Sequence, residues 1–229
     1  MPTERQLTVD QACREIAELR ITRRIDEVIV HHTWKPTAAD YRGIETVCGV
    51  RRYHQQVRGW SDNGYHVMVG PQGQIFFCRP FARSGGHTLG HNAHSIGISY
   101  IADFDAQYPE TYAGLAAGQL VVAALCERFE LGPEDVFFHS DVSSKTCPGS
   151  LMDRKEYRKA VKRFMNGKVK LVVLTGDERP DFVIAISERE EDWQELFGDE
   201  DHIAVDLHKH IADQGKVYMR KREGGDTDD

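Results

Sequence analysis

The segment of residues 139–149 constrains this chain more than any other, because it combines metal-binding side chains with residues that break regular structure. It reads His-Ser-Asp-Val-Ser-Ser-Lys-Thr-Cys-Pro-Gly, and its Ser-Ser and Pro-Gly pairs exclude a continuous helix. His139 and Cys147 are both good zinc ligands. A third ligand is offered at His31-His32, where the apolar run of residues 28–30 ends. Three protein ligands are typical of a catalytic zinc ion, so the hypothesis of a zinc hydrolase depends on these two segments meeting in the fold.

The net charge of −7 lies almost entirely in the last quarter of the chain. Residues 168–229 hold 9 Lys and Arg against 17 Asp and Glu, which leaves 20 against 19 for residues 1–167. Neither part has the basic surplus of a nucleic-acid-binding protein, so no nucleic-acid partner is predicted. A length of 229 residues suits one large domain, or one of ordinary size with a small one.

The sequence predicts a protein that is made in the cytoplasm and does not insert into a membrane. No apolar run approaches the roughly 20 residues that a membrane span needs. The polar N-terminus shows neither the apolar stretch nor the cleavage site of a secretory signal. The five cysteines are odd in number and widely spaced, which favours reduced thiols over a disulfide framework.

Hydrophobic periodicity predicts alternating strands and helices, a pattern typical of an α/β fold with one central sheet flanked by helices. Thr8 and Gln11 form a capping-box pattern at the start of the first helix. The expected helices cover residues 8–19, 40–57, 115–129 and 154–165. The expected strands cover residues 27–30, 65–69, 74–78, 96–101 and 136–138, with 65–69 and 74–78 forming a hairpin. In the second helix, five apolar residues are expected on one inward face: Ile44, Val47, Val50, Tyr53 and Val57.

The chain is expected to divide near Gly167. Residues 1–24 are predicted to form an N-terminal helical extension and residues 25–167 the main domain. Residues 168–222 are predicted to form a small acidic α/β appendage, and residues 223–229 a disordered tail. In the appendage we expect strands at 169–174, 182–186 and 217–219, and helices at 188–197 and 202–212. The sequence does not decide whether this acidic part binds a partner or regulates the main domain.

Four blocks of residues, in order along residues 29–149, resemble one family of enzymes. They are Val-His-His-Thr, Gly-Trp-Ser-Asp-Asn-Gly-Tyr-His, Gly-His-Thr-Leu-Gly-His-Asn-Ala-His-Ser-Ile-Gly-Ile-Ser, and the segment of residues 139–149. The family is that of the zinc-dependent N-acetylmuramoyl-L-alanine amidases, which include phage endolysins and peptidoglycan recognition proteins. The resemblance implies a central mixed β-sheet flanked by helices. It does not extend to residues 168–229.

The resemblance also implies a set of site residues. The family's metal ligands match His31, His139 and Cys147, which implies one Zn²⁺ ion per chain. Only one of the paired histidines is expected to bind it, because neighbours on a strand point to opposite faces. The family's two catalytic positions match Tyr65 and Lys145. Substrate contacts are assigned to four further residues, for which a packed or solvated side chain is the alternative: His32, His66, His87 and Asn92.

The implied reaction is hydrolysis of the amide bond between N-acetylmuramic acid and L-alanine in peptidoglycan. An endolysin that degrades the bacterial cell wall after release is the preferred role, and a cytoplasmic amidase of muropeptide recycling is the alternative. A peptidoglycan receptor without catalysis is a second possibility, although such a protein would be expected to lack the cysteine ligand. A third is a cysteine hydrolase, with Cys147 as nucleophile and His139 as base.

Overall fold

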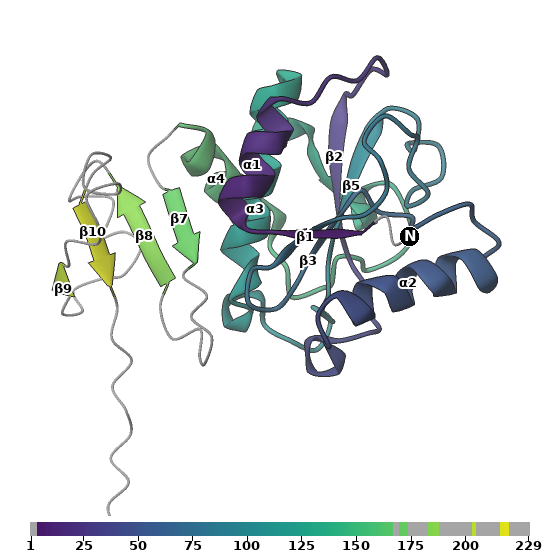
Figure 1. The fold of residues 1–229 in the computed structure, drawn as a ribbon, viewed down its shortest axis with the longest axis horizontal. Helices are drawn as coiled ribbons and strands as arrows, with labels where there is room; N and C mark the ends of the chain where they lie inside the picture. Colours follow the sequence, from purple (N-terminus) through teal and green to yellow (C-terminus); the bar gives the residue numbers. More distant parts are fainter. Residues whose placement is uncertain (1–3, 167–169, 174–182, 188–202, 205–215, 220–229) are drawn as a thin grey trace, which may run out of the picture. The chain divides into compact units, whose positions relative to one another are not determined.

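The structure is a computed structural model that describes residues 4–166, 170–173, 183–187, 203–204 and 216–219 (Figure 1). The chain forms two compact units, Met1–Met165 and Asn166–Asp229. Among the residues that the structure describes, no helix has both the length and the apolar character that a membrane crossing requires.

The first unit is built on a six-stranded mixed sheet with the strand order β1-β4-β3-β5-β2-β6. The neighbours β3, β5, β2 and β6 run parallel, whereas β4 is antiparallel to both β3 and β1. The predicted hairpin is therefore confirmed as the β3–β4 pair. The strands are β1 (Arg5–Leu7), β2 (Glu27–His32), β3 (Val67–Val69), β4 (Ile75–Phe77), β5 (Ser95–Tyr100) and β6 (Val136–Phe138).

Four α-helices flank this sheet, as predicted: α1 (Val9–Ala17), α2 (Ile44–Gln56), α3 (Gly114–Phe129) and α4 (Arg154–Met165). Figure 1 shows α1, α3 and α4 together on one side of the sheet and α2 on the other. Four short 3-10 helices occur in the connections: Ala38–Asp40, Pro109–Thr111, Pro133–Asp135 and His139–Asp141. The last of these begins directly after β6 with His139, which is a predicted metal ligand.

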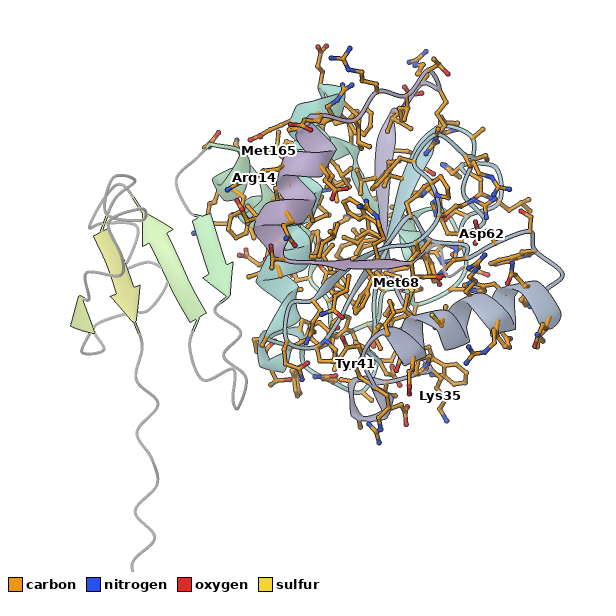
Figure 2. The ribbon with its side chains drawn as sticks, in the orientation of Figure 1. Arg14, Lys35, Tyr41, Asp62, Met68 and Met165 are labelled. Carbon is orange, nitrogen blue, oxygen red and sulfur yellow. The ribbon has the colours of Figure 1, made fainter. Side chains whose placement is uncertain are left out.

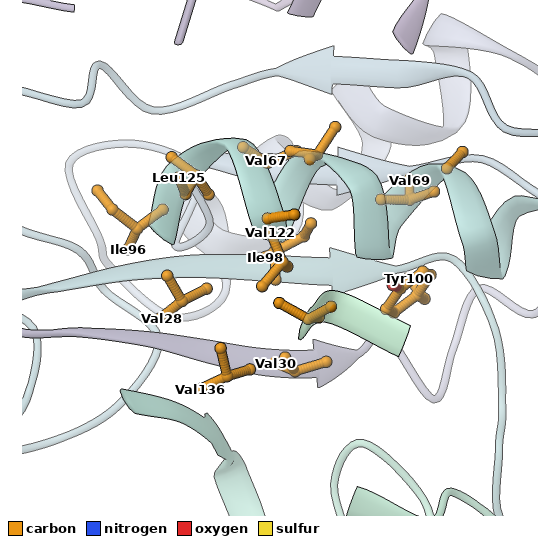
Figure 3. Close-up of a cluster of buried hydrophobic side chains, with 14 of the residues drawn as sticks. Val28, Val30, Val67, Val69, Ile96, Ile98, Tyr100, Val122, Leu125 and Val136 are labelled. Atoms are coloured by element: carbon orange, nitrogen blue, oxygen red, sulfur yellow. The ribbon is translucent and has the colours of Figure 1, made fainter. Parts of the chain in front are cut away.

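Strand alternation divides the core between the two faces of the sheet. Val67 and Val69 of β3 pack toward α3 with the neighbouring strands, in the cluster that Figure 3 shows. Met68, between them in sequence, points instead toward α2 (Figure 2). There it joins the smaller cluster that contains Val47 and Val50 of α2. The apolar cluster on this second face is the smaller of the two.

The buried face of α2 differs from the predicted one. Val47 and Val50 are buried as expected, but Tyr53 is 53% exposed and Val57 is 67% exposed. The buried residue of the last turn is His54, whose Nδ1 accepts a hydrogen bond from the Gly64 amide at 3.1 Å. The extension of the inward face to Tyr53 and Val57 was therefore wrong, because helical spacing alone does not show where the covering layer ends.

Residues 4–24 join the sheet as well as forming the predicted helix. Thr8 caps α1, with its Oγ1 accepting from the Gln11 amide and the Gln11 side chain accepting from the Thr8 amide. This confirms the capping box. The strand β1 lies just before it and pairs with β4, a contact that the sequence did not predict. A strand of three residues is too short for its hydrophobic pattern to be recognised in the sequence. It forms by pairing with β4 at the edge of the sheet.

The second unit contains a four-stranded antiparallel sheet with the order β7-β8-β10-β9. Its strands are β7 (Lys170–Val173), β8 (Val183–Ser187), β9 (Ile203–Ala204) and β10 (Lys216–Met219). The three predicted strands of this unit are confirmed. The predicted helix 202–212 is wrong at its start, because Ile203 and Ala204 pair with β10. The predicted helix 188–197 and the predicted tail 223–229 lie outside the described residues.

Close packing of α3 on the sheet gives a stability prediction. Gly118 lies in α3 against the Tyr100 ring, and an added Cβ would overlap that ring. The Tyr100 hydroxyl is fixed by a 2.7 Å hydrogen bond to the Tyr157 hydroxyl, so the ring cannot move away freely. We expect Gly118→Ala to lower the free energy of unfolding by about 1–3 kcal/mol, through overpacking.

Urea denaturation of the full chain measures this effect, and Gly49→Ala is the matched control. Gly49 lies in α2, where an added Cβ meets nothing closer than an Arg52 nitrogen at 3.8 Å. The control should be stabilised by about 0.5–1 kcal/mol, because alanine restricts the unfolded chain and favours a helix. Equal effects of the two substitutions would contradict the packing assigned to Gly118.

Candidate active site

Strand register places His31 and His139 side by side. β2 and β6 are parallel and pair Val30 with Phe138, so the next residue of each strand is a histidine at the same edge of the sheet. The two ring centroids are 4.6 Å apart. Because β2 alternates, His31 shares a face with Ile29, while His32 points to the opposite side.

The loop after β6 returns Cys147 to the same point. The Ser140 amide donates a 2.7 Å hydrogen bond to the Cys147 carbonyl, which closes the loop. Cys147 Sγ then lies 3.6 Å from His31 Nδ1. The ligand atoms of His31, His139 and Cys147 all lie within 4.8 Å of one another. In a tetrahedral zinc site, a sulfur and a nitrogen ligand are about 3.6 Å apart, so this donor set fits the ion.

A second set of hydrogen bonds orients the His31 ring. Its Nε2 lies 3.0 Å from His87 Nδ1 and 3.4 Å from Thr88 Oγ1. His87 in turn has its Nε2 3.3 Å from Ser95 Oγ. With Nε2 engaged in this way, Nδ1 of His31 is left facing Cys147. Metal-binding histidines are commonly held through their other ring nitrogen, and His87 supplies that contact here.

Burial keeps the three side chains uncharged. It lowers the pKa of His31 well below its ordinary value and lowers that of His139 to about 4. Nearby positive groups, including Lys145, add to both effects. Burial also raises the pKa of the Cys147 thiol to about 12. Two neutral imidazoles and a thiol in a buried group are suited to a cation, which stabilises the thiolate form.

The three side chains line a cavity of about 960 Å³ together with Tyr65 and Lys145. The Tyr65 ring lies 5.2 Å from the His31 ring. Burial raises the pKa of Tyr65, so its phenol stays protonated and can donate a hydrogen bond at neutral pH. Lys145 is exposed and is anchored two residues before Cys147. The structure thus brings together all five residues that were matched to metal-binding and catalytic positions.

The four predicted substrate-contacting residues fall into two pairs. His32 and His87 line the cavity, although both are largely buried. His66 is fully buried and does not line the cavity; its Nδ1 accepts from the Gly97 amide. Asn92 is also absent from the cavity wall, and its side-chain oxygen accepts from the amides of His87 and Thr88. The structure therefore places His66 and Asn92 where they hold the loop, and their contact with substrate stays a prediction.

Aromatic residues of the cavity wall were not assigned from the sequence. Trp34, Tyr53 and Trp60 line it, and Trp34 and Tyr53 are largely exposed. Trp34 has a φ of 57°, which a bulky residue rarely adopts and which is a feature of functional sites. Trp60 stacks on His54 with ring centroids 4.7 Å apart. Trp60 lies within a block that carries the family resemblance, so that block could have indicated an aromatic residue in the cavity wall.

Comparison with known proteins gives a family match. A family model described as N-acetylmuramoyl-L-alanine amidase matches residues 21–150. A human protein named N-acetylmuramoyl-L-alanine amidase is 31% identical over 128 residues, which are 54% of this chain and 22% of that protein. The chain thus spans less than a quarter of this curated relative.

Two solved structures are similar to part of this chain. Drosophila PGRP-LB is 27% identical with a TM-score of 0.50, over 57% of this chain and 78% of that one. The Ph2119 endolysin of a Thermus scotoductus bacteriophage has a TM-score of 0.51 over 62% of this chain and 88% of that one. At 22% identity, the second likeness shows the fold alone. The predicted mixed-sheet fold is confirmed by both.

The environment of Cys147 gives a prediction about its reactivity. A thiol with a pKa of about 12 is protonated throughout the neutral range, and its thiolate is present only as pH rises toward that value. At pH 8 the thiolate fraction is about 10⁻⁴, against roughly a quarter for an ordinary thiol. The more basic thiolate is also more nucleophilic, which offsets part of this difference, so we expect alkylation by iodoacetamide on the order of 100-fold slower than for an ordinary thiol. Mass spectrometry of the Cys147 peptide from chelator-treated protein measures this rate.

The same protein unfolded in urea is the control, because Cys147 should then react as an ordinary cysteine. Rapid labelling of the folded protein at neutral pH would contradict the prediction. It would instead favour the cysteine hydrolase, which requires a thiolate at neutral pH.

Proposed function

Because the chain belongs to the N-acetylmuramoyl-L-alanine amidase family, we propose that it hydrolyses the amide bond between N-acetylmuramic acid and L-alanine in peptidoglycan. The observation that carries this proposal is the meeting of His31, His139 and Cys147 in a cavity that Tyr65 and Lys145 also line. We assign one Zn²⁺ ion to those three ligands. A bound zinc ion would polarise a carbonyl oxygen and make water a better nucleophile at neutral pH.

Lys145 and Tyr65 supply the polar groups that amide hydrolysis needs. When water adds to the amide carbon, negative charge develops on the carbonyl oxygen, before the C–N bond breaks and the amine leaves with a proton. The Lys145 ammonium can stabilise that charge. The Tyr65 phenol, kept protonated by burial, can donate a hydrogen bond to the same oxygen. Both groups approach from walls of the cavity that holds the metal ligands.

The cavity wall suits a sugar–peptide substrate. Exposed Trp34 and Tyr53 offer apolar rings on which a sugar face or a peptide side chain can pack. Arg58 also lines the cavity, with its guanidinium 5.6 Å from the Trp60 ring centre. A fixed positive charge there can bind a carboxylate of the stem peptide. These features support recognition of peptidoglycan over a small neutral amide.

A peptidoglycan-binding protein without catalysis is the second candidate. It is favoured by the likeness to relatives named for recognition, such as the Drosophila melanogaster peptidoglycan-recognition protein SC1a, which is 31% identical over 128 residues. Against it stands the complete set of Cys147, Tyr65 and Lys145 in one cavity. A binding protein needs the cavity but has no use for a preoriented metal site beside a lysine and a tyrosine.

For the biological role we propose an endolysin that is made in the cytoplasm and degrades the bacterial wall after its release. The four motif blocks resemble those of phage endolysins, and this resemblance supports the bacteriolytic role. The alternative is a cytoplasmic amidase of muropeptide recycling. We further propose that the acidic second unit binds a partner protein, which its surplus of Asp and Glu supports; a wall-binding module is the alternative.

Digestion of purified peptidoglycan tests the reaction. We expect mass spectrometry to find free stem peptides that begin with L-alanine, because the amide to the lactyl group is the bond cleaved. Intact sugar–peptide links together with strong binding to the wall would support the binding protein instead. Parallel digestion of soluble muropeptides separates the roles: an endolysin should act well on intact wall, whereas a recycling enzyme should prefer the soluble fragments.

Substitutions in the cavity test the assigned roles. Lys145→Ala should lower kcat about 10²–10³-fold while the bound zinc is retained, because one charge-stabilising group is lost. Cys147→Ala should lose the zinc ion of this cavity and the activity together. Lys35→Ala is the matched control, because Lys35 lines the same cavity with its ammonium 5.6 Å from the Trp34 ring.

The control should keep kcat within a few-fold, whatever its effect on KM. Zinc content by elemental analysis and steady-state rates on soluble muropeptide measure the three variants. Equal loss of kcat in Lys35→Ala and Lys145→Ala would show a general effect of cavity charge and would remove the specific role of Lys145.

A further inference from the structure

A second group of metal-binding side chains lies at the opposite ends of the same strands. Glu27 begins β2, and His91 and His94 lie in the loop that enters β5. The parallel register pairs Glu27 with Ser95, so the loop meets the start of β2 there. None of the three residues lines the cavity of the candidate active site.

The side chains of this group converge on one carboxylate. His91 Nδ1 lies 2.7 Å from Glu27 Oε1, and His94 Nδ1 lies 3.3 Å from the same oxygen. All three ligand atoms lie within 4.8 Å of one another. In a tetrahedral site, a nitrogen and an oxygen ligand are about 3.4 Å apart, which the His94–Glu27 pair already matches. The His91–Glu27 pair would have to widen by roughly 0.7 Å, with loss of its hydrogen bond.

One ring nitrogen in this group makes an ion-pair contact but no hydrogen bond. Among the described residues, His94 Nδ1 is buried without a hydrogen bond, although Glu27 Oε1 lies 3.3 Å away. A metal ion held between these two atoms would satisfy both of them. Glu27 itself is only 6% exposed, and burying its charge also favours a bound cation.

The backbone that carries these residues is already fixed. The Asp26 amide donates to the His94 carbonyl at 2.8 Å, and Ser95 Oγ donates to the His91 carbonyl at 2.8 Å. The His94 amide donates to the His91 carbonyl at 3.2 Å. Binding a metal would therefore require side-chain rotation alone, with little ordering of the chain.

We propose that Glu27, His91 and His94 form a second site for a divalent transition metal, with Zn²⁺ as the preferred ion. Two imidazoles and one carboxylate favour zinc, cobalt or nickel over calcium and magnesium, which prefer oxygen ligands alone. The partly exposed rings leave the remaining coordination position open to water. Because it has no thiolate and is nearer to solvent, this site binds more weakly than the one at Cys147. The proposal does not depend on the amidase reaction.

The second site is connected to the first through β2 and through the loop before β5. Glu27 and His31 lie on the same face of β2, four residues or roughly 13 Å apart. The loop that carries His91 and His94 also carries His87, whose Nδ1 contacts the His31 ring. Asn92, between the two proposed ligands, holds the amides of His87 and Thr88. A metal at Glu27 would thus fix the loop that orients a ligand of the first site.

Zinc stoichiometry of the full chain tests the second site. We expect about two zinc ions per wild-type chain in equilibrium dialysis against micromolar Zn²⁺, and one in His94→Ala and in Glu27→Gln. Cys147→Ala should also hold one, and the double variant with His94→Ala none. Leu89→Ala is the control: it changes the same loop at a 96% exposed side chain and should keep both ions.

Cobalt substitution identifies which site is filled. Cobalt in His94→Ala should retain the sulfur-to-metal absorption that Cys147 produces, whereas cobalt in Cys147→Ala should show only the weaker visible bands of a nitrogen–oxygen site. Far-UV circular dichroism checks that each variant is folded. One zinc ion in the wild type, or the same zinc content in wild type, Glu27→Gln and His94→Ala, would overturn the proposal. Zinc retained by the folded double variant would place the second ion elsewhere in the chain.

Discussion

The parallel pairing of β2 with its two neighbours is the constraint on which the rest of the site depends. Pairing of Val30 with Phe138 brings His139 beside His31, and pairing of Glu27 with Ser95 brings the preceding loop to the start of β2. A shift of one residue in either ladder would turn the side chains of that strand to the opposite face. The many buried valines and isoleucines on the α3 side make such a shift unfavourable. The hydrophobic core thereby fixes the geometry of the polar face.

The buried histidines of that polar face are satisfied by one another and by neighbouring backbone and hydroxyl groups. Burial holds His31, His66 and His87 in their neutral forms, since it lowers the pKa of each ring. A neutral ring has one donor and one acceptor nitrogen, so each ring needs partners of definite polarity. His87 contacts His31, Thr88 and Ser95, and His66 accepts from the Gly97 amide. The loop between β4 and β5 is thus part of the site's support, which explains why its polar residues are buried.

Much of the fold and the central part of the site could be predicted from the sequence, whereas long-range details could not. Thr8 with Gln11, and the runs that form β2, β5 and α3, are local signals, and the structure reproduces them. The face of α2 was misjudged at Tyr53 because exposure depends on the layer that covers a helix. The group at Glu27 was missed because 64 residues separate it from His91, and only the sheet register joins them.

The strand β2 shows how one short segment can serve both stability and chemistry. All six of its residues are buried, which for a parallel strand usually implies a continuous apolar run. Val28 and Val30 follow that rule and pack toward α3. On the other face the order is Glu27, Ile29 and His31, with a polar group at each end and one apolar residue between them. The polar groups can be buried only because loops from β5 and β6 bring partners to each end. The two proposed cation sites therefore lie at the two ends of β2, with Ile29 between them.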